Sequence, residues 1–125
     1  MPGLELEGWD RVANEIGDYM TRSVLENFRT GGRPNRWQPL RSGEPSHLLD
    51  SGMLFASITY DVSRQGPDWV VKIGPKGVPY AAVHQFGYPA RNIPQREYLV
   101  FQRQDKRWIG QRILKHIKSQ LSGKP

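Results

Sequence analysis

The sequence contains no cysteine among its 125 residues. This absence excludes a disulfide framework, a thiol nucleophile and a thiolate metal site. The chain also has no run of 18 or more apolar residues, so we expect no membrane span and no membrane partner. Its first residues, 1–7, are acidic and lack the basic and then apolar pattern of a signal peptide. The composition therefore predicts a protein that is made and folded in a cytosol.

Recognisable patterns of catalytic or metal-binding residues are also missing. The three histidines, His47, His84 and His116, are far apart, and none has a second histidine three or four residues on. The neighbours Asp50 and Ser51, together with the histidines, are the only hint of a hydrolase or toxin, and local backbone hydrogen bonds of Asp50 and Ser51 before a short helix are the simpler interpretation. We therefore predict no catalytic residue, no metal site, no cofactor and no enzymatic activity.

Positive charge is concentrated towards the C-terminus. The whole chain has a net charge of +6, but residues 91–125 hold nine Lys and Arg against two Asp and Glu, a net of +7. Such asymmetry favours an anionic partner, either nucleic acid or an acidic protein surface. A basic helix that only aids solubility is the alternative.

Apolar residues at three- and four-residue spacing predict two long helices, over 8–30 and 105–121. We interpret the stripe of the first helix as core packing, and we expect residues 119–125 to fray. Between the first helix and the rest, residues 30–45 are rich in Gly, Pro and Arg and predict a loop. Trp37 and Leu40 would anchor this loop against the body, and stacking of Trp37 on nucleic-acid bases is the alternative.

Alternating apolar and polar residues predict strands over 55–63 and 69–74, joined as an antiparallel hairpin. A third strand is expected over 97–101, and a further one near 88–93 is left open. A short helix capped by Ser46 would precede the hairpin. The chain is thus predicted to form one α+β domain, 1–125, in which N-terminal and C-terminal helices pack on a small antiparallel sheet. The polar face and the edges of the sheet would be free for subunit contacts.

The densest run of aromatic residues, Pro and Gly lies at 78–99. The spacing of Tyr80, Val83 and Phe86 predicts a short helix, which Gly87 would end. His84 and Gln85 would hydrogen-bond backbone groups in this packed turn, or meet a neighbouring subunit.

This stretch, together with two motifs upstream of it, resembles the phage virion morphogenesis family, the tail-completion proteins of Mu-like phages (G protein type). The motifs that carry the resemblance are Trp37-Gln38-Pro39-Leu40, Leu48-Leu49-Asp50-Ser51-Gly52-Met53-Leu54, Tyr80-Ala81-Ala82-Val83-His84-Gln85-Phe86-Gly87, Ile93-Pro94-Gln95-Arg96 and Tyr98-Leu99. The chain departs from the family where Gln95-Arg96-Glu97-Tyr98 replaces the usual Ala-Arg-Pro-Phe.

The resemblance implies a structural virion protein that completes the tail or the head–tail neck after synthesis in the host cytoplasm. It implies a homo-oligomeric ring, with a hexamer as the expected form, and neighbouring tail and neck proteins as partners. We expect the following residues to shape the contacts: Trp37, Tyr80, His84, Phe86, Tyr88 and Arg96. Internal packing is the alternative for each and is favoured for Tyr80 and Phe86. Arg96→Glu would then block particle completion while leaving a folded monomer.

A small basic nucleic-acid-binding module is the alternative function. Its support is the basic C-terminal helix together with Trp108 and the arginine-rich loop. The residues that would face DNA are Arg107, Arg112, Lys115 and Lys118. No helix-turn-helix, zinc-finger or RNA-binding signature is present in the sequence. The two functions overlap if the genome passes through a ring of subunits, because these residues would then meet genomic DNA in passing.

Overall fold

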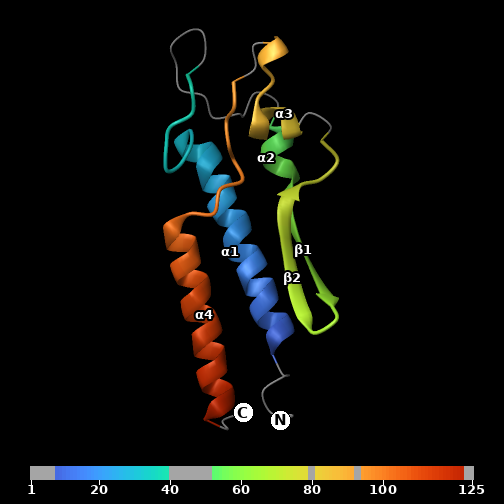
Figure 1. Ribbon diagram of the computed structural model, residues 1–125, viewed down its shortest axis with the longest axis vertical. Coiled ribbons are helices and arrows are strands. Elements are labelled where there is room, and N and C mark those ends of the chain that lie inside the picture. The colour runs from blue at the N-terminus through green and yellow to red at the C-terminus, as the bar shows by residue number, and fades with distance from the viewer. Residues whose placement is uncertain (1–7, 40–51, 79–80, 92–93, 123–125) are drawn as a thin grey trace.

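The computed structural model describes residues 8–39, 52–78, 81–91 and 94–122. Its elements are α1 (Trp9–Thr30), α2 (Met53–Ser57), β1 (Ile58–Gln65), β2 (Asp68–Pro75), α3 (Ala81–Phe86), the 3-10 helix η2 (Pro89–Arg91) and α4 (Arg103–Leu121). Long helices at both ends of the chain and an antiparallel hairpin between them confirm the predicted α+β class (Figure 1).

Helix α1 is the centre of the fold. The β1–β2 hairpin and α4 both pack against it, and Figure 1 shows them on its two sides. The stripe predicted for this helix is buried at Val12, Ala13, Met20, Val24 and Phe28. The predicted helix over 8–30 is therefore confirmed. Its apolar stripe is removed from water because the hairpin covers one flank and α4 covers the other.

The hairpin approaches α1 closely at Gly17. A Cβ atom built on Gly17 would overlap the ring of Tyr60 from β1. Glycine is thus required here by the close approach of a side chain rather than by an unusual backbone angle.

The hairpin pairs eight residues of β1 with eight of β2, from Ile58 opposite Pro75 to Gln65 opposite Asp68. Because side chains alternate between the two faces of a strand, Tyr60, Val62 and their partners share the face towards α1. The other face carries Thr59, Asp61 and their partners. The predicted hairpin is confirmed, and its outer face is polar.

The predicted start of the first strand at residue 55 is wrong, since α2 continues to Ser57. Leu54 and Ile58 are both buried. They are four residues apart, so a helical turn places both side chains on the same side of the chain. Ser57 closes this turn by donating from its hydroxyl to the carbonyl of Leu54 at 2.7 Å.

The strand predicted over 97–101 is wrong, as is the described part of the one near 88–93, where η2 forms instead. Residues 95–98 do alternate between exposed and buried, as the strand prediction required. However, among the described residues the backbone of this segment is bonded mainly by side chains, and by the His84 carbonyl, rather than by a neighbouring strand. The indole of Trp37 donates to the Glu97 carbonyl at 3.0 Å, and the Asn27 amide donates to the Tyr98 carbonyl at 2.7 Å.

Helix α4 begins at Arg103, two residues before its predicted start, and continues to Leu121, within the segment expected to fray. Its apolar stripe is only partly covered, with Leu114 at 50% and Leu121 at 66% exposure. Within the described part of the chain, no helix is long and apolar enough to cross a membrane.

Candidate subunit-contact surface

The candidate surface is the α3 end of the molecule, which we define as residues 81–91 together with 94–99. Helix α3 ends at Gly87, whose φ angle is +78°. A Cβ atom at this position would lie 2.9 Å from the backbone nitrogen of Gln95. The chain returns past α3 at residues 94–99, which we call the returning chain. Both the left-handed backbone of Gly87 and the close approach of the returning chain require glycine, so the predicted end of the helix is confirmed.

Gln85 joins α3 to the returning chain. Its side-chain oxygen accepts hydrogen bonds from the backbone nitrogens of Tyr98 at 3.1 Å and Leu99 at 3.0 Å. Its side-chain nitrogen donates to the Leu99 carbonyl at 3.2 Å. One amide thus takes the place of a neighbouring strand, which confirms that Gln85 bonds backbone groups.

Arg96 holds the loop after α1 against the α3 end. It is 8% exposed, and its guanidinium donates to the Gln38 carbonyl at 3.0 and 2.9 Å. Its backbone nitrogen donates to the His84 carbonyl at 2.8 Å. A glutamate here would face a carbonyl oxygen instead of donating to it. Arg96→Glu is therefore expected to disturb the subunit itself and is unsuitable as an interface variant.

Trp37 is part of the core. It is 8% exposed, and its ring meets Phe28 edge-on with centroids 5.7 Å apart. The prediction that Trp37 anchors the loop is confirmed, and stacking on nucleic-acid bases is contradicted because the ring is buried inside the subunit. Leu40, its predicted companion, lies outside the described residues.

Two predicted contact residues are exposed at the α3 end. The side chain of Phe86 is 72% exposed and that of Tyr88 is 45% exposed. The preference for packing Phe86 inside is wrong, because α3 faces the core through Ala81, which is 5% exposed. Of the other two candidates, His84 is half-buried, and Tyr80 lies outside the described residues.

A buried polar cluster lies behind this surface, and the sequence patterns described above did not predict it. Asp105 is fully buried, and both of its carboxylate oxygens accept from the Ser23 hydroxyl at 2.9 Å. It also accepts from the backbone nitrogen of Gln102 at 2.9 Å, which completes a capping box at the start of α4. The three-residue spacing from Gln102 to Asp105 is the signal that could have revealed it.

The cluster extends to Tyr19, Asn27 and Arg33. Burial, together with the hydrogen bond to Asp105, raises the pKa of the Tyr19 hydroxyl above its ordinary value. Arg33 donates to the Asn27 side-chain oxygen at 2.8 Å. Since buried polar groups are stable only when they are bonded, this cluster fixes the loop and α4 relative to α1.

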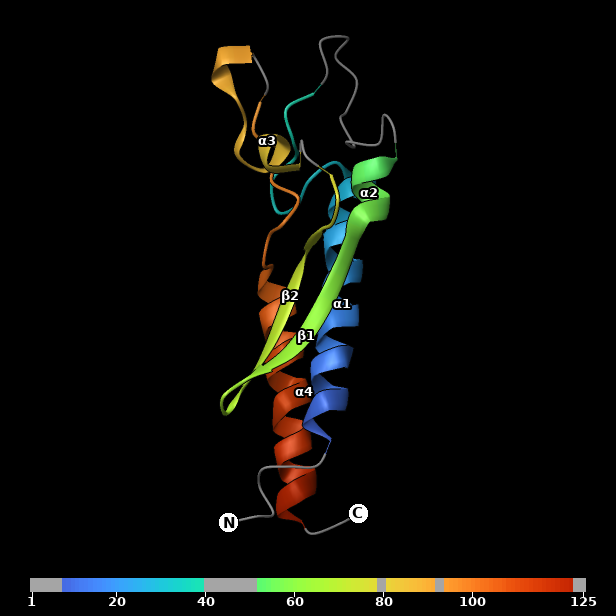
Figure 2. The same cartoon turned by 90° about the vertical axis from the view of Figure 1, so that its right-hand side faces the viewer.

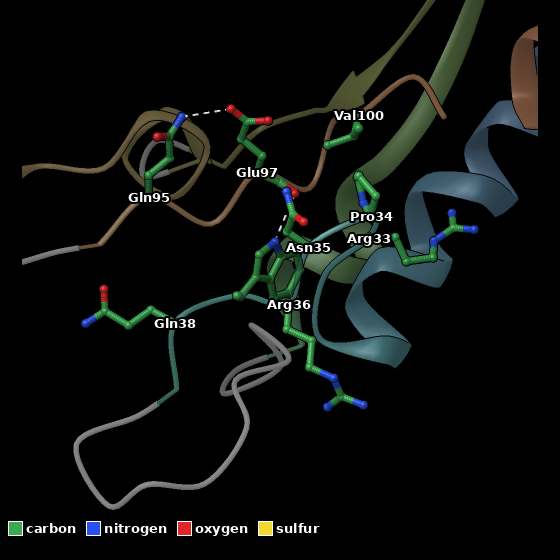
Figure 3. A pocket seen from close by; sticks show the side chains of 9 residues that line it. Arg33, Pro34, Asn35, Arg36, Gln38, Gln95, Glu97 and Val100 are labelled. Carbon is green, nitrogen blue, oxygen red and sulfur yellow. Dashed lines mark hydrogen bonds between the residues drawn. The ribbon is translucent and has the colours of Figure 1, made fainter. Parts of the chain in front are cut away.

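A polar pocket of about 240 Å³ lies between the loop after α1 and the returning chain (Figure 3). Figure 3 shows Gln95 donating to Glu97 at its rim, at a distance of 3.0 Å. Its lining residues are Arg33, Pro34, Asn35, Arg36, Trp37, Gln38, Gln95, Glu97 and Val100. Among the residues that the structure describes, no group of three or more His, Asp or Glu could hold a metal ion.

The predicted DNA-facing residues divide into two groups on α4. Arg107, Lys115 and Lys118 are exposed. At 100° per residue they fall within one side of the helix. Arg112 instead forms an ion pair with Glu15 on α1, with nitrogen–oxygen distances of 2.5 and 3.1 Å. The fold thus brings three of the four residues together on a solvent-facing side.

Comparison with known proteins gives one family. A profile of the phage virion morphogenesis family matches residues 4–118. The chain is 35% identical over 100 residues to the Mu-like prophage FluMu G protein 2 of Haemophilus influenzae. The aligned region covers 76% of this chain and 68% of that protein. No solved structure matches. The chain therefore belongs to the phage virion morphogenesis family and has a structural role in building the virion.

Proposed function

We propose that this protein completes the tail or the head–tail neck of a phage particle by assembling as a homo-oligomeric ring, with a hexamer as the expected form. Neighbouring tail and neck proteins would be its other partners, and the protein would act without catalysis. The observation that carries the proposal is the exposure of Phe86 and Tyr88 at the end of the molecule. Large aromatic side chains gain free energy when a partner covers them.

The backbone beneath these two side chains supports the proposal. Gln85 and Arg96 hold the α3 end through four side-chain hydrogen bonds to backbone groups between 2.9 and 3.1 Å. Little conformational freedom would then be lost when a partner binds, and this favours affinity. A head-to-tail contact between this surface and a different surface of the next subunit generates a closed ring when the rotation between subunits closes.

The test is to complement a phage that lacks this gene with Phe86→Ser/Tyr88→Ser. We expect filled heads and unjoined tails, or tails of abnormal length or end structure, in electron micrographs of the lysate. Phe101→Ser is the matched control, because Phe101 is 51% exposed but lies next to α4, where Lys106 stacks over it. Normal infectious particles from the double variant, with thermal unfolding unchanged, would contradict the proposal.

A passing contact with genomic DNA is the second candidate. The exposed side of α4 that carries Arg107, Lys115 and Lys118 favours it. Binding through phosphates weakens steeply as salt rises from about 50 to about 200 mM. Replacing all three residues by Glu should abolish a low-salt shift of DNA. The same change at exposed Arg11, Arg22 and Lys76 is the charge-matched control. No shift by the unaltered protein at low salt would contradict this contact.

A further inference from the structure

The hairpin has two unpaired edges among the described residues. The sheet contains only β1 and β2, eight residues each, and Figure 2 shows the hairpin in front of the helices with both strands in view. An edge strand exposes a row of backbone N–H and C=O groups that can pair with another strand. The hairpin therefore has the capacity to accept a strand on each side.

The alternation of hydrogen-bonded and non-bonded pairs along the hairpin shows which residues point their backbone groups outwards. The Lys76 nitrogen donates to the Ser57 carbonyl at 3.1 Å, at the end of the ladder. Bonded and non-bonded pairs alternate along an antiparallel ladder, so the pairs of Tyr60 with Ile73 and of Val62 with Val71 are non-bonded. The backbone groups of these four residues consequently point away from the partner strand.

We propose that the outer edge of β2 pairs antiparallel with the outer edge of β1 from a second copy of this chain, so that hairpins join side by side. This inference rests on the ring proposed above and adds to the α3 end a second contact, between the hairpins of neighbouring subunits. The contact is heterologous, as a cyclic ring requires. It also removes the free edges, because every strand then has two neighbours when the ring closes.

Charge complementarity selects the register of the pairing. Asp61 and Lys72 are exposed on the polar face and lie opposite each other within the hairpin. If the same register is repeated between copies, Lys72 of one copy lies opposite Asp61 of the next. A slip of two residues, the smallest that keeps the two faces in place, puts Lys72 opposite Thr59 or Ser63 instead. Opposite charges across a pair stabilise a sheet, so we assign the repeated register.

The absence of cysteine makes disulfide trapping a clean test. Full-length Asp61→Cys and Lys72→Cys variants are mixed, and the mixture is oxidised. Opposite residues in a non-bonded pair have Cβ atoms about 4.5–5.5 Å apart, close to disulfide distance. We expect a disulfide-linked dimer in the mixture and none from either variant alone. Asp61→Cys with Lys76→Cys is the matched control, because residue 76 lies roughly 13 Å further along the strand.

Charge reversal separates contact between copies from folding of the hairpin. Asp61→Lys and Lys72→Asp each place like charges inside the hairpin and between identical copies. In a mixture the charges inside each hairpin are unchanged, but every contact between unlike copies joins opposite charges. We expect each variant alone to lose the oligomer in sedimentation, and the mixture to regain it.

Both experiments are performed on purified protein and in lysates that assemble particles. A dimer restricted to the Asp61→Cys and Lys72→Cys mixture supports the hairpin contact. If the unaltered chain forms an oligomer but the mixture of Asp61→Cys and Lys72→Cys forms no disulfide, the hairpin contact is overturned and the ring is left intact. A chain that stays monomeric in both settings overturns the hairpin contact and the ring together.

Discussion

The two halves of α1 are packed in different ways. The C-terminal half contributes Val24 and Phe28 to a cluster with Trp37, Leu54, Ile58, Ala81 and Tyr98, all 8% exposed or less. The N-terminal half buries Val12 and Ala13 but leaves Trp9 and Ile16 only half-buried. One half thus forms a closed core, and the other keeps apolar surface partly in water.

The difference arises from how many segments meet each half. Around Phe28, the loop at Trp37, α2, α3 and the returning chain at Tyr98 converge from distant parts of the sequence. Along the N-terminal half, the far part of the hairpin and the last turns of α4 provide the cover. Half-buried apolar side chains there include Val62, Val71 and Ile117. An interior needs neighbours on all sides, so the comparison teaches that the subunit closes one half by itself and leaves apolar surface of the other half partly in water.

The largest expected effect tests the closed half. Phe28→Ala removes a fully buried ring that touches Trp37, Phe55 and Tyr98. We expect the free energy of unfolding to fall by about 3–5 kcal/mol in urea titrations. Ile117→Ala, at a half-buried position in the open half, should cost only about 1 kcal/mol. Equal losses for the two variants would show that the halves are packed alike.

A smaller loss of stability is expected at Gln85, whose side chain bonds backbone groups that a neighbouring strand would bond in a sheet. Gln85→Ala leaves the backbone nitrogens of Tyr98 and Leu99 without their acceptor and should cost about 1–3 kcal/mol. Amide hydrogen exchange at residues 98 and 99 should become faster. Gln85→Glu keeps an acceptor oxygen for these nitrogens but turns its other oxygen towards the Leu99 carbonyl, so it should retain only part of the protection. Unchanged exchange in Gln85→Ala would mean that another group bonds these nitrogens.

The smallest effect concerns the ion pair in the open half. The hydrogen bond from Arg112 lowers the pKa of the Glu15 carboxyl below its ordinary 4.5. Its stabilisation is therefore fully present above about pH 4.5 and is lost as pH falls through the lowered pKa. The Glu15 side chain is 40% exposed, so solvent screening limits the effect to about 1 kcal/mol or less.

The measurement compares the unaltered protein with Glu15→Gln in urea titrations from pH 7 to pH 3. The unaltered protein should be more stable at pH 7, and the difference should shrink below about pH 4.5. A difference that stays constant down to pH 3 would show that the carboxylate charge does not stabilise the fold.

The sequence alone determined the elements that depend on local pattern. The helices α1 and α4, the alternation in the hairpin and the stop at Gly87 follow the predicted pattern, although the α4 stripe is only partly covered. Each depends on neighbours a few residues away, either through the helical or strand period or through the backbone freedom of glycine. The family resemblance likewise depends only on short motifs and on their order along the chain.

Only the tertiary structure decided what the segment at 95–99 pairs with and which aromatic side chains are exposed. Burial alternates there as in a strand, but most of the groups that bond its backbone are side chains, those of Gln85, Asn27 and Trp37, up to 71 residues away. Phe86 is exposed while Trp37 is buried, although both are large and apolar. Which side chain bonds a backbone group depends on segments that are distant in the sequence. The side of a short helix that meets the core depends on such segments too. Sequence periodicity does not relate these segments to one another.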